Sequence, residues 1–327
     1  MKRIVPVILL TTALILSAHE GRAWVLFGTV PDVPAAYAVL LGTIGKYQYQ
    51  PKLAKGFANA SVYTSHVATL RGYQGYDRFA ISVGTMAGVQ APSVTTNLSY
   101  YKSLPKKLKD QGDIYAGVAW NAWSANVGVR IPVVDLSVSA KFGKLSYTYS
   151  DYHFDGTHAG GMLNYQLVNP KAPPVKFVLW RGISIGSGFL WQNNNTNLKL
   201  KLPTLSFEGY TVKPEMNLQI KTSSYIIPLE ISTAVRLLWV LNIHAGGGID
   251  FAWGSSSIRY SSYGVALGTP SALFWAYGRQ SGKGSSHYMP KIFCGPGLNF
   301  GPVIIDIPFT YYFVGGLNVG VTVGVVW

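Results

Sequence analysis

The stretch "GLNVGVTVGVVW", residues 316–327, ends the chain with its most regular alternation of apolar and small residues. Valines occupy every second position from 319 to 325, and Trp327 takes the last place. Successive side chains of an extended strand point to opposite faces, so this spacing predicts a strand with one apolar face. The opposite face carries Asn318, Gly320, Thr322 and Gly324.

The same period of two recurs inside the chain, most clearly in "VDLSVSAKF" (134–142), "GISIGSGFLWQ" (182–192) and "LNIHAGGGIDF" (241–251). Short connections alternate with long ones at 91–113, 193–215 and 252–290, as expected for antiparallel hairpins. The sequence predicts an all-β, up-and-down antiparallel barrel of about ten strands, with 12 to 14 as the alternative. The ten predicted strands are 79–90, 114–130, 134–148, 159–168, 176–192, 216–233, 240–251, 291–300, 303–313 and 316–327.

Composition indicates that this barrel crosses a membrane. The chain is 48% hydrophobic and only 12% charged, yet beyond the first residues it has no run of about 18 apolar residues for a spanning helix. A soluble β-sandwich would place charges on its solvent face, whereas here the second face is mostly glycine, serine and asparagine. We therefore expect the apolar face to contact lipid and the other face to line a lumen. The lumen-facing residues predicted by parity are Asp135, Ser137, Ser139, Lys141, Asn164, Gln166, Ser184, Gln192, Asn242, His244 and Asp250.

Two places break the alternation. Arg181 has the parity of the apolar face, and a lipid-facing cation at mid-depth costs about 2–4 kcal/mol, so a bulge near Trp180 or a later strand start is expected. Around 221–224 the phase slips, because Met216, Leu218 and Ile220 share one parity and the later apolar residues share the other. A second bulge is expected there.

The N-terminus has the pattern of a secretory signal peptide. Lys2 and Arg3 precede an apolar run of 13 residues from Ile4 to Leu16, and Gly21 and Ala23 suit a cleavage site after Ala23. Residues 1–23 are predicted to be removed, residues 24–78 to form an N-terminal plug or periplasmic cap, and residues 79–327 to form the barrel. Within the cap, 32–45 suits a short helix, and 56–70 suits a further pair of strands as an alternative.

The final strand, with its alternating valines and terminal aromatic residue, resembles the C-terminal β-signal of bacterial outer-membrane β-barrel proteins. This resemblance implies export, insertion by the outer-membrane barrel assembly machinery and residence among the lipids of the bacterial cell outer membrane. The residues that match the assembly signal are Val319, Val321, Val323, Val325 and Trp327.

Catalytic motifs are absent from the sequence. His244 and Asp250 share a strand face but lie about 20 Å apart at roughly 3.3 Å per residue, which excludes a direct dyad. No H-E-x-x-H pattern occurs, and the G-x-S-x-G spacing at 182–186 lies inside a predicted strand, not at the strand-to-helix turn of a nucleophile elbow. His153, His158 and His287 fall in predicted external loops. We expect a protein that is not an enzyme and that has no cofactor and no metal.

Three functions fit such a barrel. A porin-like channel for small solutes is the first, and inward glycines and serines favour an open lumen over one filled with side chains. A surface adhesin or binding scaffold is the second, through the long loop 252–290 and a basic run at 105–110 that suits acidic surface lipids. A transporter of hydrophobic ligands, similar to fatty-acid transporters, is the third; nucleic acid is not an expected partner. The predicted loop-binding residues are Arg259, Tyr260, Tyr263, Trp275, Tyr277, Arg279 and Lys283.

Overall fold

The structure is a computed structural model. It describes residues 24–27, 51–69, 78–90, 117–171, 177–201, 205–207, 210–212, 215–267, 272–281 and 284–327. The predicted signal peptide 1–23, the predicted helix 32–45, the basic run 105–110 and Lys283 lie outside these residues.

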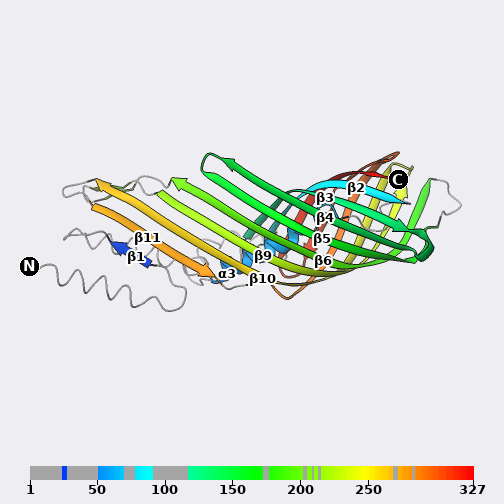
Figure 1. The fold of residues 1–327 in the computed structure, drawn as a ribbon, viewed down its shortest axis with the longest axis horizontal. Helices are drawn as coiled ribbons and strands as arrows, with labels where there is room; N and C mark the ends of the chain where they lie inside the picture. Colours follow the sequence, from blue (N-terminus) through cyan, green and yellow to red (C-terminus); the bar gives the residue numbers. More distant parts are fainter. Residues whose placement is uncertain are drawn as a thin grey trace, which may run out of the picture.

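Antiparallel strands close into a ring, which confirms the predicted all-β barrel of about ten strands (Figure 1). Each strand pairs with the next, and β15 pairs with β2 to complete the circle. The short strands β13 and β14 share one position in the ring, because both pair with β12 and β15 and are separated only by Ile307 and Pro308. The ring strands are β2 (Phe79–Gln90), β3 (Gly117–Ile131), β4 (Leu136–Tyr149), β5 (Tyr152–Val168), β6 (Val178–Lys201), β9 (Glu215–Leu237), β10 (Leu241–Leu267), β12 (Tyr288–Phe300), β13 (Val303–Asp306), β14 (Phe309–Tyr312) and β15 (Gly316–Val326).

The ring turns apolar side chains outward and polar ones inward. On β15 the outward Val321 is 42% exposed, whereas the inward Asn318 and Thr322 are 0% and 3% exposed. The neighbouring β2 alternates in the same way along its whole length. This is the reverse of a water-soluble sheet protein and is typical of a barrel that contacts lipid.

Aromatic residues mark both edges of the apolar outer surface. At the end that carries the short turns and the C-terminus, here named the turn end, Phe79 stacks on Trp327 with ring centroids 5.8 Å apart. At the opposite end, the hairpin end, Trp191, Tyr225 and Trp253 lie side by side on β6, β9 and β10. The twelve steps from Leu241 to Trp253 along β10 span about 40 Å, or about 28 Å in height at a tilt of about 45°, which is close to the ~25 Å apolar band of membrane barrels.

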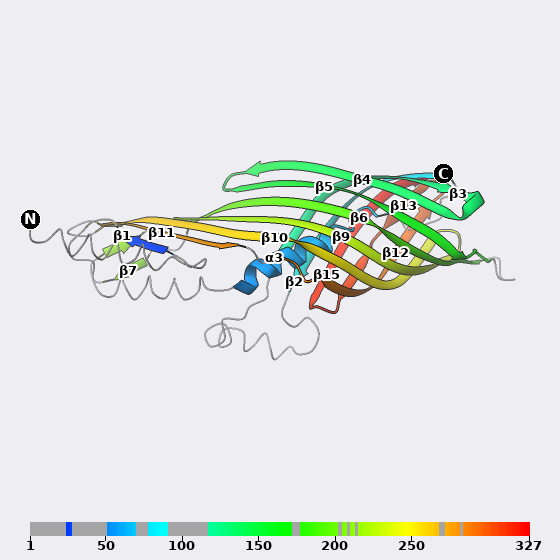
Figure 2. The ribbon, with the colours of Figure 1, turned by 60° about the horizontal axis from the view of Figure 1, so that its bottom comes forward.

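Beyond the aromatic row, β6, β9 and β10 continue as an extension that projects from the ring (Figures 1 and 2). There β11 (Ala272–Ser281) pairs with β10, and β1 (Trp24–Phe27) pairs with β11. The smaller strands β7 (Leu205–Phe207) and β8 (Tyr210–Val212) pair with each other, and β8 also pairs with β10. Much of the two predicted external loops 193–215 and 252–290 is therefore strand, because their backbone groups pair with each other instead of with water.

In the extension the outward face of the sheet becomes polar, and apolar residues turn inward. Outward positions now carry polar residues such as Lys221, which is exposed, while the inward Ile258 and Phe154 are each 5% exposed. The predicted bulge at 221–224 is wrong, since the pairing of β9 with β10 is unbroken from Leu237 to Glu215. The apolar residues change parity there because the surroundings of the two sheet faces change along a regular strand.

The irregularity predicted near Arg181 is confirmed. The register of β6 against β9 shifts between Trp180 and Ile183, and Gly182 takes a φ of +77°. This bulge turns Arg181 away from the lipid-facing surface, and the residue is only 8% exposed.

A helix, α3 (Pro51–Thr64), lies against the inner wall of the ring. Pro51 opens the helix, alanines fill its body, and from Ala58 to Thr64 every residue is buried. The alternative interpretation of 56–70 as strands is wrong, because small residues allow a helix to fit inside the barrel. Among the residues described, no helix has the length and apolarity needed to cross a membrane.

Wall glycines make room for α3. A Cβ atom on Gly117 would lie 2.1 Å from the backbone of Gly56, and one on Gly88 would lie 3.0 Å from the carbonyl oxygen of Ala60. These glycines accommodate the lumenal helix, whereas the sequence suggested that inward glycines favour an open lumen.

The direction of this lumenal segment is set by its contacts. Ser256, beyond the aromatic row, donates a hydrogen bond to the carbonyl oxygen of Ala54, whereas Ser82, near the turn end, donates to Ala68 at 3.3 Å. The chain therefore enters the lumen at the hairpin end and descends toward the turn end, where β2 begins. Residues 51–69 thus occupy the lumen and do not cap the turn end.

Candidate functional site: a lumenal charge network

A cluster of buried charged side chains joins the lumenal segment to the wall. His66 comes from the turn after α3, Glu230 from β9, Asp250 from β10 and Lys291 from β12. The three wall residues point inward because each has the inward parity of its strand. All four side chains are at most 4% exposed.

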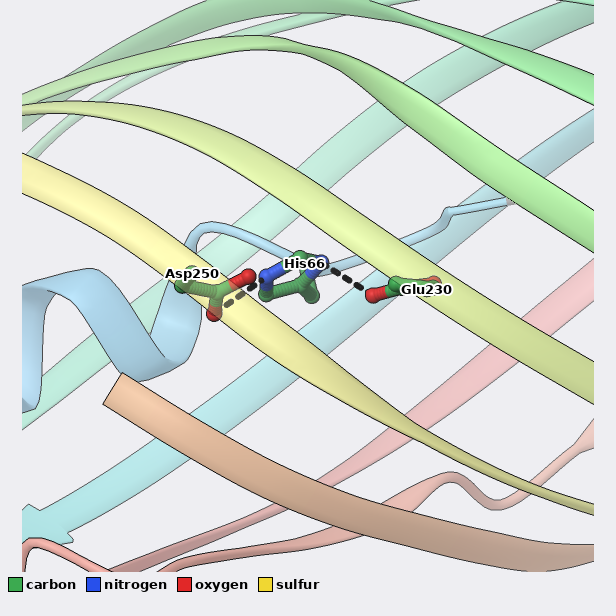
Figure 3. Close-up of side chains that lie close together, drawn as sticks. All are labelled: His66, Glu230 and Asp250. Atoms are coloured by element: carbon green, nitrogen blue, oxygen red, sulfur yellow. Dashed lines mark hydrogen bonds and ion pairs between the residues drawn. The ribbon is translucent and has the colours of Figure 1, made fainter. Parts of the chain in front are cut away.

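Short contacts connect the four groups. Lys291 Nζ donates to Glu230 Oε1 and to Asp250 Oδ1, both at 2.6 Å. His66 Nε2 lies 3.0 Å from Asp250 Oδ2, and His66 Nδ1 lies 3.6 Å from Glu230 Oε1. Figure 3 shows the imidazole of His66 held between the two carboxylates. Two carboxylates thus share one lysine and one histidine.

The network has the donor atoms of a metal site as well. His66, Glu230 and Asp250 offer ligand atoms that all lie within 4.8 Å of one another. However, Lys291 Nζ already contacts both carboxylates, and a divalent cation would have to displace this ammonium group. The arrangement is best described as a buried ion network in which Lys291 supplies the positive charge and His66 hydrogen-bonds within it.

Aromatic stacking extends the network toward the barrel seam. Tyr312 donates to Asp250 Oδ2 at 3.2 Å, and its ring stacks on Tyr63 of α3 with centroids 4.1 Å apart. The Tyr63 hydroxyl donates to Gln90 of β2. Asn318 of β15 donates to the carbonyl oxygen of Tyr63 at 2.6 Å. The end of α3 is therefore bound to both strands of the closing seam.

A second group of contacts holds the opposite side of the segment. Lys141 of β4 donates to the carbonyl oxygens of Ser65 and Val67 and to Thr69 Oγ1, the last two at 3.2 Å. Gln192 of β6 donates to Thr64 Oγ1 at 2.9 Å. Buried carbonyl groups after a helix need such donors, since water is excluded.

The predicted lumen-facing residues mostly lie on the inner face. Buried are Ser137, Ser139, Lys141, Asn164, Gln166, Ser184, Gln192, Asn242, His244 and Asp250. Of these, Lys141, Gln192 and Asp250 contact the lumenal segment. His244 Nδ1 lies 3.2 Å from Asp306 Oδ1, so the two residues rejected as a direct dyad have separate acidic and basic partners.

Asp135 differs from its prediction. It follows the short helix η1 (Pro132–Val134) in the turn before β4, with a φ of +49°, and its carboxylate lies 3.8 Å from Arg130. It is half-buried at the turn end and does not line the lumen. The tight turn takes this residue out of the strand.

The predicted loop residues lie on strands of the extension. Arg259, Tyr260 and Tyr263 belong to β10, and Trp275, Tyr277 and Arg279 belong to β11. His158, predicted in an external loop, lies on β5 with 5% exposure and 3.2 Å from Asn121 Nδ2. His153 also lies on β5, and both were misplaced because the strand begins earlier than predicted.

The predicted assembly-signal residues form one outward row. Val319, Val321, Val323, Val325 and Trp327 are between 42% and 64% exposed. Trp327 receives a hydrogen bond from the backbone of Arg78 at 2.7 Å and donates one to Phe79 at 2.8 Å. The last residue therefore helps to close the ring.

Sequence reasoning missed His66, Glu230, Lys291 and Tyr312. Glu230 and Lys291 each interrupt an otherwise apolar or small stretch, at inward parity. An isolated charge at such a position is the signal that would have found them, because a buried charge requires a partner.

A closed antiparallel ring with an apolar outer band and a polar interior defines an outer-membrane-type β-barrel. Residues 33–327 match the sequence profile described as Lsa36-like, and the chain belongs to this family. No curated protein matches the sequence.

Solved structures show a distant similarity. The translocator domain of autotransporter NalP from Neisseria meningitidis has 8% identity and a TM-score of 0.31, over 90% of this chain and 97% of that one. The transport unit of the autotransporter AIDA-I from Escherichia coli has 8% identity and a TM-score of 0.33, over 86% and 99%. A Pseudomonas aeruginosa FadL homologue has 9% identity and a TM-score of 0.27, over 84% and 98%.

Proposed function

We propose that this chain is an outer-membrane surface scaffold, without enzymatic activity, that presents the extension to partners outside the cell. The observation that carries the proposal is the binding of residues 51–69 inside the ring. Side chains from β2, β4, β6, β9, β10, β12 and β15 contact this segment, and its residues 58–69 are buried. A segment that is held inside the ring by seven strands occupies space that a water-filled path would need.

A porin-like channel for small solutes is the alternative. It would require residues 51–69 to leave the lumen. Asp250, Glu230 and Lys291 would then lose their contacts with His66 and be hydrated instead. Breaking a buried ion network by losing one partner costs about 3–5 kcal/mol, so the open form would be rare at equilibrium. The charged, hydrogen-bonded interior also gives little support to a carrier of hydrophobic ligands.

The extension supports the scaffold role. Strands β9, β10 and β11 carry paired backbone beyond the aromatic row, so the surface they present is rigid. Rigid presentation lowers the entropy cost of binding a partner. The chemistry of the outward face is polar, as a surface in contact with water requires.

Conductance in planar bilayers tests the proposal. The full chain without residues 1–23 should give no stable ohmic steps. A variant that lacks residues 51–69 and retains heat-modifiable gel migration should conduct. Stable conductance steps from the chain that lacks only residues 1–23 would contradict the plugged scaffold and favour the channel.

We also propose that the last strand is the signal read by the barrel assembly machinery. Deleting Val325–Trp327 removes the last two residues of the outward row. It also removes the backbone hydrogen bonds that Trp327 makes with Arg78 and Phe79. The truncated chain should remain in the periplasm in cell fractionation, while Trp327→Phe should assemble normally. Normal outer-membrane recovery of the truncated chain would argue against this role.

A further inference from the structure

The outward face of the extension contains a basic pocket at a fixed height above the lipid-facing surface. Arg259 of β10, Gln219 of β9, Asn197 of β6 and His153 of β5 lie in register across four neighbouring strands. Lys199 follows in the next row, opposite Asn217. These residues line a surface pocket of about 420 Å³.

Parity places this pocket on the same face as the membrane-contacting residues. Arg259 follows Trp253 by six residues on a strand with unbroken register, so both side chains have the same orientation. Six residues span about 20 Å along the strand, or about 14 Å in height at a tilt of about 45°. The headgroup region of a simple bilayer extends roughly 5–8 Å beyond the hydrocarbon core, so a lipid anchored at the aromatic row needs a larger, saccharide-type headgroup to reach this height.

The chemistry of the pocket suits an anion. Lys199 and Arg259 provide two cations, and the side-chain amides of Asn197, Asn217 and Gln219 provide neutral donors. Asp155 lies 2.7 Å from His153 Nε2 and is engaged by it. Glu215 lies one row beyond Asn217 and opposite Lys201, and the carbonyl oxygen of Asp151 accepts a hydrogen bond from the backbone of Lys199. Arg259 Nε is buried and has no hydrogen-bond partner among the residues described. A buried guanidinium donor without a partner is costly, and an oxyanion in the pocket would satisfy it.

We propose that this pocket binds the phosphate group of an outer-leaflet lipid. The inference rests on the membrane orientation in the proposed function and adds a ligand to it. A lipid whose chains cover Tyr225 and Trp253 would carry its headgroup up the same face to Arg259 and Lys199. A soluble anion would lack these apolar contacts, so the lipid is the favoured source of the phosphate.

Native mass spectrometry of the refolded full chain in detergent tests the proposal. The probes are a bisphosphorylated glucosamine-disaccharide lipid and its dephosphorylated counterpart. We expect the phosphorylated lipid to bind at least about tenfold more tightly, because hydrogen bonds to a charged group are worth roughly 1.5–3 kcal/mol. Equal binding of the two lipids would overturn the proposal.

Two variants locate the effect. Lys199→Gln with Arg259→Gln should lose about tenfold in affinity for the phosphorylated lipid. The matched control, Lys171→Gln with Arg130→Gln, removes one lysine and one arginine at the turn end and should change affinity less than about twofold. An equal loss in both would indicate general charge attraction and overturn the pocket. Displacement of the lipid by equimolar inorganic phosphate would show a free-anion site and overturn the lipid as its ligand.

Heat-modifiable migration verifies that each variant is folded, and conductance of the same samples separates this proposal from the scaffold role. A silent bilayer without phosphate preference would contradict only the lipid pocket, whereas conducting wild-type chain would contradict the plugged scaffold itself.

Discussion

The same strands behave in opposite ways on the two sides of the aromatic row. Between the turn end and Trp253, β9 and β10 turn apolar residues outward, whereas in the extension they turn polar residues outward and bury Ile258. The backbone register does not change between these regions. The surroundings of the outward face, lipid in one region and water in the other, therefore select the residue types while strand pairing continues.

The charge network is the most sensitive part of the barrel region. Lys291→Met would remove the ammonium group that two buried carboxylates share, and we expect a loss of about 3–5 kcal/mol in the free energy that holds the plug. Hydrogen exchange of residues 51–69 should rise accordingly. Adding Glu230→Gln to this variant should restore part of the protection from hydrogen exchange, since one histidine then faces one carboxylate. If exchange does not rise in Lys291→Met, the network does not anchor the plug.

A single cation distinguishes the two regions directly. Ile231→Arg, on the lipid-facing part of β9, should reduce the free energy of unfolding in vesicles by about 2–4 kcal/mol. Ser223→Arg, on the same face of the same strand beyond Tyr225, should change it by less than about 0.5 kcal/mol. Equal costs at the two positions would show that the aromatic row is not the boundary of the membrane.

Substitutions at the wall glycines that contact α3 should have a smaller effect. Gly117→Val adds a side chain where a Cβ atom would already meet Gly56, and overpacking of this kind costs about 1–3 kcal/mol. Limited proteolysis should then cut residues 51–69 more rapidly. Gly247→Ala, at a looser wall position where the nearest atom is 3.3 Å away, should leave the cutting rate unchanged; faster cutting in both would point to general loosening of the wall.

The topology of the N-terminus is testable without altering stability. Because the lumenal segment enters at the hairpin end and β1 pairs with β11 in the extension, an epitope tag placed directly before Trp24 should be accessible to antibody on intact cells. A tag in the 301–302 turn should be accessible only after permeabilisation. The reverse pattern would invert the orientation of the barrel.

Much of the ring was predictable from the sequence. Alternation of period two in segments such as 134–142 and 316–327 is local, so it predicted the strands, their inward and outward faces and the closing strand. The displaced Arg181 was likewise visible as a charge at the wrong parity. Local pattern could not predict that His66 would meet residues 164 or more positions away, because contact between distant segments depends on how the ring closes around α3.

The class of fold is already visible in the sequence, since lipid outside and polar groups inside impose a repeating pattern on every spanning strand. The contents of the lumen and the end of the membrane region depend on contacts between distant parts of the chain. Alanine-rich residues 51–64 form a helix because wall glycines leave space for one, and the phase slip near 221–224 is explained by passage from lipid to water. Both outcomes depend on what surrounds a residue, which one-dimensional spacing does not contain.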